Sequence, residues 1–261
     1  MAGLYTQHFL YKEEYMRLII NADDFGLSPS VNRGIVECFE NGLITSTSLM
    51  MNTPYTDDAI ELIKQHNITN VGIHLNLTYG KSVLPREEIP SLVDSRGVFH
   101  YVCMLGYYTQ YVDAKKELRA QIEKFLATGL TPTHLDHHHY FHEVPNILKA
   151  YLELAQEYNL PVRAMSNEAR RQAKLYGLKT TDAFSFDFHN SGVDISTLVA
   201  LHQNFKDTDI TLELLTHPGY IDDYTAGQTG YLLREEEIHH LKLAKDTNLW
   251  QDIDLISFRD L

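Results

Sequence analysis

Residues 17–29 constrain the fold most, because they join a strand to a helix through two adjacent acids. Residues 17–20 form a short run of strand type, and Gly26 permits a sharp turn. A serine and a proline follow, a pair typical of the start of a helix. Asp23 and Asp24 are therefore expected at the carboxyl end of a strand, where α/β folds gather ligands and catalytic groups.

The two neighbouring carboxylates need an explanation, since like charges at close range resist joint ionisation unless a cation or a proton intervenes. Neighbouring residues on a strand point to opposite faces, so Asp23 and Asp24 are expected to have different roles. One carboxylate could bind a metal ion while the other moves protons. The alternative at this point is a solvated turn or a helix cap.

The rest of the chain alternates between strand and helix patterns, which predicts parallel strands with right-handed crossovers. No glycine-rich phosphate loop is present, which disfavours a nucleotide-binding open sheet. We predict an α/β barrel of about seven parallel strands, with all strand carboxyl ends on one face. The expected strands are 17–20, 46–51, 71–77, 133–136, 161–165, 184–188, 210–215 and 254–258, and the expected helices are 31–39, 56–65, 115–128, 143–158, 195–205 and 235–245.

We expect a single domain over residues 1–261, with 44% hydrophobic residues to form its core. Residues 1–16 are expected to be an extension on the outside. Residues 80–112 show no clear period, and a loop this long inside a compact domain is usually functional, so this insertion is a candidate lid. Its tyrosines could stack on sugar rings or could simply pack.

The composition excludes several classes of partner. A formal net charge of −13 argues against nucleic acid and is compatible with a neutral or cationic small ligand. Cys38 and Cys103 are far apart in the sequence, so we expect a reducing compartment and no disulfide framework. No signal peptide and no membrane-spanning run is recognisable, so we expect a cytoplasmic protein without a membrane partner.

The clearest strand is 71–77, in which apolar residues alternate with Gly72, His74 and Asn76. If the apolar face packs on helices, His74 and Asn76 point into a barrel or crevice. A single histidine on a strand is more often a hydrogen-bonded core residue than a metal ligand. Further donors are needed to decide between the two.

Residues 134–142 contain five histidines and one aspartate within nine residues. Histidine is the commonest metal ligand and the usual acid or base near neutral pH. On a strand, His134, Asp136 and His138 would share one face, and the carboxylate could bind a metal or orient an imidazole. The alternative is a polar turn with surface histidines.

Together, an aspartate and two histidines from three strand ends would form an open metal site. Zinc hydrolases use three protein ligands and a water, whereas Mg²⁺ keeps more waters. The other acid of the pair would then be a general base. His217 follows the strand at 210–215, and a histidine opposite the base could protonate a leaving group or stabilise an oxyanion.

Four motifs resemble those of the YdjC family of carbohydrate deacetylases, also called the chitooligosaccharide deacetylase or ChbG-like family. They span nearly the whole chain in the family's order, and together they are specific although each alone is weak. The four motifs are Asn-Ala-Asp-Asp-Phe-Gly (21–26), Gly-Ile-His-Leu-Asn-Leu-Thr (72–78), Thr-His-Leu-Asp-x-His-His (133–139) and Thr-His-Pro-Gly-Tyr (216–220).

The resemblance implies a distorted (β/α) barrel related to polysaccharide deacetylases, and hydrolysis of an acetamido group on a sugar with a divalent ion, Mg²⁺ or Zn²⁺. By position, it implies three metal ligands, a catalytic base (Asp23), a general acid (His217) and an arginine that holds the base (Arg163). The implied metal ligands are Asp24, His74 and His138.

The motif at 133–139 departs from the family pattern, because His137 takes the place of a small residue and Tyr140 replaces a histidine. His138, His139 and His142 still match, but substrate contacts there are expected to differ. We expect further residues to contact the substrate or to support the metal ligands, namely Asn76, His134, Asp136, His139 and Tyr220.

The leading hypothesis is a deacetylase that acts on a small N-acetylated sugar, with a homodimer as a candidate assembly. One alternative is a metal phosphoesterase on a similar barrel, which would need more basic residues near the site. Another is a sugar-binding protein without catalysis, which does not explain a free acid beside three ligands.

Overall fold

Strand β1 (Arg17–Phe25) is the centre of the sheet, and every residue after Arg17 is buried. The computed structural model describes residues 16–139, 144–228 and 231–261. The predicted extension over 1–16 lies outside the described residues, except for Met16, which is fully buried. β1 continues past its predicted end through the acid pair, because it is paired with neighbours on both sides.

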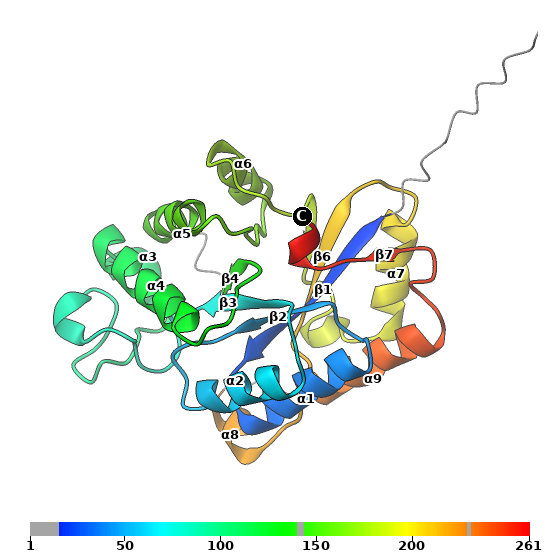
Figure 1. Ribbon diagram of the computed structural model, residues 1–261, viewed down its shortest axis with the longest axis horizontal. Helices are drawn as coiled ribbons and strands as arrows, with labels where there is room; N and C mark the ends of the chain where they lie inside the picture. Colours follow the sequence, from blue (N-terminus) through cyan, green and yellow to red (C-terminus); the bar gives the residue numbers. More distant parts are fainter. Residues whose placement is uncertain (1–15, 140–143, 229–230) are drawn as a thin grey trace, which may run out of the picture.

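In the part of the chain that is described, seven parallel strands form one curved sheet in the order β4-β3-β2-β1-β6-β5, with β7 beside the start of β1. Helices follow most of the strands and lie around the sheet (Figure 1). The predicted α/β barrel of parallel strands is confirmed. The strands after β1 are β2 (Ser46–Leu49), β3 (Val71–Leu75), β4 (Leu135–His137), β5 (Ala183–Ser185), β6 (Thr211–Thr216) and β7 (Asp254–Leu255).

The strand predicted at 161–165 is wrong. Only Val162 makes a strand-like bridge, to Leu135 at the edge of β4. Leu135 is hydrogen-bonded through its backbone to Pro161 and Arg163, whereas the amide of Val162 points to the other side and donates to the carbonyl of Lys179. Residues 161–163 therefore continue the sheet beyond β4 irregularly, and the barrel is distorted there.

The helices cover the outside of the sheet, with α4 and α5 beside β3 and β4, and α1 beside β1 (Figure 1). Ser28 caps α1 by accepting the amide of Val31, as the sequence predicts. No helix in the described ranges is long and apolar enough to cross a membrane. The helices are α1 (Pro29–Glu40), α2 (Thr56–Gln65), α3 (Leu105–Tyr108), α4 (Tyr111–Leu126), α5 (Pro145–Tyr158), α6 (Asn167–Leu175), α7 (Ile195–Phe205), α8 (Asp223–Gln228) and α9 (Arg234–Asp246).

The candidate lid over 80–112 contains short antiparallel bridges, two 3-10 turns and α3, and it leads directly into α4. Tyr101 and Tyr107 are largely exposed there. Its role as a lid stays a prediction.

The strand register brings the predicted functional residues to one edge of the sheet. His74 on β3 lies opposite Asp136 on β4, and Ala22 on β1 lies opposite Thr216 on β6. Because these strands are parallel, the residues that follow them meet at the same rim. That rim carries the candidate site.

Candidate active site

Asp23 and Asp24 lie at an irregularity in the pairing of β1 with β2. The register shifts between Ala22 and Phe25, and Asp24 adopts a left-handed backbone conformation with a φ of 70°. Such a conformation typically costs about 1–3 kcal/mol, and this strain concentrates at functional sites. Both carboxylates line one cavity, so the expected alternation to opposite faces is not observed.

This cavity has a volume of about 230 Å³ and opens at the carboxyl ends of the strands. It collects both acids of the predicted pair and four of the predicted histidines. Its walls are formed by Asp23, Asp24, His74, Tyr79, His138, His139, Met165, His189, Leu215, His217, Tyr231 and Arg234.

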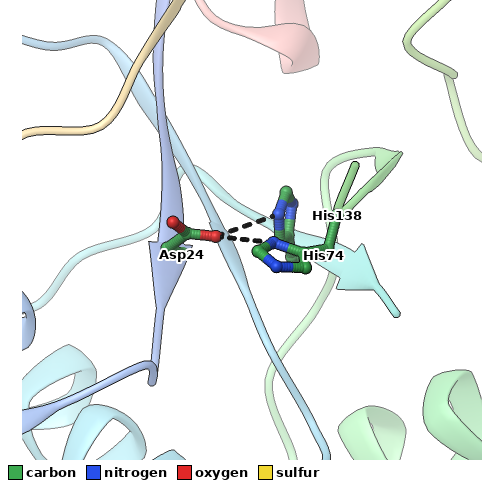
Figure 2. A group of neighbouring side chains, drawn as sticks. All are labelled: Asp24, His74 and His138. Atoms are coloured by element: carbon green, nitrogen blue, oxygen red, sulfur yellow. Dashed lines mark hydrogen bonds and ion pairs between the residues drawn. The ribbon is translucent and has the colours of Figure 1, made fainter. Parts of the chain in front are cut away.

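Asp24, His74 and His138 offer three donor atoms within 4.8 Å of one another. Figure 2 shows the Asp24 carboxylate facing both imidazole rings, with its Oδ1 at 2.9 Å from Nδ1 of His138 and 3.4 Å from Nε2 of His74. Burial alone would raise the pKa of Asp24, but His138 and Arg234 outweigh burial and hold that pKa well below its usual range. One carboxylate and two imidazoles suit a divalent ion.

The orientation of His74 also suits a metal ion. Its Nδ1 lies 2.8 Å from Oδ1 of Asp136, whose Oδ2 accepts from Ser48 Oγ at 2.6 Å. A carboxylate in this place keeps the proton on Nδ1 and leaves Nε2 as the donor to a metal. Nε2 is buried and has no hydrogen-bond partner among the described residues.

The electrostatic potential around His74 is strongly negative. Burial lowers the pKa of His74, yet the carboxylates of Asp136 and Asp23 outweigh burial and raise it to about 10. The same negative potential favours a divalent cation on the Nε2 side of the ring.

Arg163 holds Asp23 in a bidentate ion pair. Its two terminal nitrogens donate to the two carboxylate oxygens at 2.7 Å each, while Asn21 Nδ2 also donates to Oδ1 at 2.8 Å. The Nε of Arg163 donates to Glu213 at 2.6 Å, and Nη2 lies 3.2 Å from Asp136. One buried guanidinium thus links the acid that faces the cavity to the carboxylate that orients His74.

Arg234, which we did not predict from the sequence, binds the other side of Asp24. Its Nη2 donates to Oδ2 of Asp24 at 2.6 Å, and its Nη1 donates to the carbonyl of His217 at 3.2 Å. The two oxygens of Asp24 are therefore divided, with Oδ2 on Arg234 and Oδ1 toward the two imidazoles. This division favours a metal bound by one oxygen.

His217 follows β6 and lines the same cavity as the metal-ligand candidates. Its backbone N–H donates to Glu237, and its ring lies 4.8 Å from that of His189 between centroids. Burial lowers the pKa of His217 well below its usual range. The imidazole is therefore uncharged near neutral pH. It can act as a general acid only if another group supplies a proton to it.

Four of the five predicted supporting residues do not line the cavity, namely Asn76, His134, Asp136 and Tyr220. His134 is fully buried and stacks on Phe258 with centroids 3.7 Å apart, and its Nε2 lies 3.7 Å from Asp136. Its ring lies over Gly72, where a Cβ would meet it at 2.3 Å. Asn76 holds the following turn, because its Nδ2 donates to the carbonyl of Tyr79 at 2.7 Å.

His139 lies at the rim of the cavity, where its Nδ1 is 2.8 Å from Thr78 Oγ1. Tyr220 points elsewhere, since its hydroxyl donates to Glu37 on α1. His137 is buried, with Nδ1 at 2.8 Å from the carbonyl of His139, and Tyr140 and His142 lie outside the described residues.

Several residues of the site carry a signal that could have been found in the sequence. Arg234 and Glu237 are buried on α9, on the same face as its apolar residues. Their spacing to Ile238 and Leu241 follows the helical repeat of that face. Glu213 occupies a buried position in the apolar strand β6, where a charged residue is unusual.

A sequence model described as YdjC-like protein matches residues 17–251. The chain belongs to the YdjC family. Proteins called carbohydrate deacetylase are similar to it in sequence. One from Clostridium beijerinckii is 37% identical over 250 residues, which cover 94% of this chain and 100% of that protein. Another from Geobacillus stearothermophilus is 37% identical over 247 residues, covering 93% of this chain and 96% of that protein.

Solved structures support the same relationship. A proposed cellobiose-phosphate cleavage protein from Enterococcus faecalis superposes with a TM-score of 0.88 at 32% identity, over 94% of this chain and 98% of that chain. A lactam utilization protein from Thermus thermophilus gives a TM-score of 0.55 at 15% identity, over 93% of this chain and 100% of that chain. The second likeness shows a shared fold, whereas the first also reflects membership of the YdjC family.

Proposed function

We propose that this YdjC-family chain is a metal-dependent carbohydrate deacetylase, which hydrolyses the acetamido group of an N-acetylated amino sugar or a short chitooligosaccharide-like chain. One observation carries the proposal. A single cavity holds an Asp-His-His donor set next to a second acid, Asp23, that is held separately by Arg163. The carbohydrate deacetylases that resemble this chain support the same activity.

Asp24, His74 and His138 would hold one divalent ion, Mg²⁺ or Zn²⁺. The Nε2 of His74 is buried, has no hydrogen-bond partner in the described part of the chain and is held by Asp136 through Nδ1, which supports this choice of ligands. When bound, such an ion supplies Lewis acidity for the acetyl carbonyl and lowers the pKa of water.

Asp23 would act as the general base. Arg163 and Asn21 fix the orientation of its carboxylate, and its Oδ2 lies 3.9 Å from Nε2 of His74. A proton acceptor next to the metal ligands can take the proton of the attacking water. His217, which lines the same cavity, would give a proton to the departing amine.

The cavity suits the acetamido end of a sugar. Its volume of about 230 Å³ is smaller than the roughly 300–1,000 Å³ of sites for drug-sized ligands. It would take the acetamido group and part of one ring, leaving further sugars outside. Tyr79 and His139 at the wall offer ring faces and polar atoms to those sugars.

The contents of the cavity favour amide hydrolysis over the alternatives. Arg234 is the one arginine or lysine among its described lining residues, and it is already paired with Asp24. A phosphoesterase would need cations that are free to bind phosphate. A sugar-binding protein without catalysis would have no use for the strained backbone at Asp24, which brings both carboxylates into one cavity.

The test is mass spectrometry of N-acetyl mono- and disaccharides incubated with the protein and Mg²⁺, Zn²⁺, Co²⁺ or Mn²⁺. We expect the mass change that replaces one acetyl group by a hydrogen atom, and release of acetate, with at least one of these ions. Asp23→Asn serves as the matched inactive variant. Phosphate release from sugar phosphates without acetate release would favour a phosphoesterase, and sugar binding without any product would favour a binding protein.

A further inference from the structure

Glu237 lies in the first turn of α9, behind the cavity, and is fully buried. Burying an ionised carboxylate is costly unless a cation or hydrogen bonds compensate for the lost water. Within the described ranges, no lysine or arginine nitrogen lies within 4.0 Å of this group, and its ion-pair contact is with Nδ1 of His217 at 4.0 Å. Buried carboxyl groups without a cation partner concentrate at functional sites.

Two hydrogen bonds fix this carboxyl group relative to His217. Its Oε2 accepts from the backbone N–H of His217, and its Oε1 accepts from the hydroxyl of Tyr231. The Nδ1 of His217 is buried and has no hydrogen-bond partner among the described residues. His217 lines the cavity and its Nδ1 lies on the side of Glu237, so Nε2 is the nitrogen left to meet a substrate.

We propose that Glu237 is the positioning residue of His217, sharing a proton with its Nδ1 so that Nε2 presents a proton to the departing amine. The inference rests on the proposed deacetylase function. A separation of 4.0 Å is longer than a hydrogen bond, but such contacts often tighten only when the substrate is bound.

The charges of the two groups agree with this arrangement. Burial raises the pKa of Glu237 to about 8, and burial lowers that of His217 well below its usual range. Near neutral pH the shared proton therefore lies on Glu237, and the imidazole carries its single proton on Nε2. This supplies the proton source that a buried neutral His217 otherwise lacks.

Every proton in the cleavage of the C–N bond has a donor and an acceptor. As the C–N bond breaks, its electron pair stays on nitrogen, which takes the proton from Nε2 of His217. Nδ1 takes the proton from Oε1 of Glu237, so the imidazole stays neutral and Glu237 becomes a carboxylate. Asp23 has meanwhile taken one proton from water, and solvent exchange returns both acids to their starting states.

The test is a double-mutant cycle on acetate release, using His217→Ala, Glu237→Gln and the double variant. Glutamine keeps the size of Glu237 and an acceptor for the backbone N–H, but it cannot give up a proton. Glu235→Gln is the matched control, because Glu235 lies in the same helical turn, is exposed and accepts only the amide of Ile221 in the described structure. Thermal unfolding and metal titration of every variant check the fold and the metal site.

We expect Glu237→Gln to lower kcat by about ten- to a hundredfold, with KM and metal affinity within about twofold of the parent. In the His217→Ala background the same change should have no further effect, since Glu237 acts through that imidazole. Equal loss in both backgrounds, or parent-like kcat for Glu237→Gln, would overturn the inference while leaving deacetylation established. No acetate release by the parent would instead refute the proposed function.

Discussion

Asp136 orients His74, one of the proposed metal ligands, so its replacement by asparagine tests the proposed ligand arrangement most directly. The carboxylate lies 2.8 Å from Nδ1 of His74, and its Oδ2 also accepts from Ser48 at 2.6 Å and from Asn21 at 3.2 Å. Asparagine keeps the shape of the side chain. If its oxygen accepts from His74, however, its amide nitrogen faces those other donors.

The expected loss follows from that conflict. Changes to a carboxylate that orients a metal-binding histidine typically weaken metal binding about 10- to 100-fold, which is about 1.4–2.7 kcal/mol. Arg163 keeps its ion pairs with Asp23 and Glu213, so the charge of its guanidinium stays compensated. The Asp136→Asn variant should therefore fold, with loss of metal affinity as its main defect.

Isothermal titration with Zn²⁺ or Co²⁺ measures the affinity, and thermal unfolding of the metal-free variant checks the fold. Ser48→Ala is the comparison variant, since it removes one donor to Asp136 and a 3.1 Å contact of Ser48 Oγ with Nδ1 of His74, but keeps the hydrogen bond between Asp136 and His74. We expect this variant to weaken binding by less than about fivefold. A folded Asp136→Asn variant that binds metal within about twofold of the parent would show that His74 is not the oriented ligand described here.

Two further predictions concern the acids. Asp23→Asn should abolish acetate release and largely keep metal binding by titration, whereas Asp24→Asn should lose both; equal loss of metal would mean that their roles are wrongly divided. Burial raises the pKa of Glu237 to about 8, so between its unfolded pKa and pH 8 the folded protein holds one more proton than the unfolded chain. This group should lower the free energy of unfolding as pH rises in that window, by at most about 1.4 kcal/mol per pH unit. Urea unfolding at pH 5.5 and 8 should show a smaller fall in the free energy of unfolding for Glu237→Gln than for the parent. An equal fall in the two proteins would contradict the raised pKa.

The alternation of strands and helices was predictable because each element carries its own pattern. The apolar run before Asp23 and the serine and proline after it mark the end of β1 and the start of α1, and both are observed. The strand expected at 161–165 failed because only Val162 has a strand partner there, in a single bridge to Leu135. A short apolar run does not reveal how far the pairing with a distant strand extends.

The rim of the barrel could be predicted in outline, since parallel strands place their carboxyl ends on one side. The sequence also indicated an aspartate and two histidines from different strand ends. It did not indicate that Asp24 has a φ of 70°, because the alternation rule assumes an unbroken strand. The shift in register between Ala22 and Phe25 determines this conformation, and it depends on the pairing with β2.

The contribution of helix α9 to the cavity was harder to predict. In the sequence, Arg234 and Glu237 look like part of a charged surface helix, since three glutamates follow one another there. Only the helical repeat shows that both lie on the buried face. From that face Arg234 reaches Asp24, and Glu237 reaches His217. One helical turn thus contacts both a metal-ligand candidate and the acid candidate, so substitutions in this turn should be interpreted by the strand end that each side chain contacts.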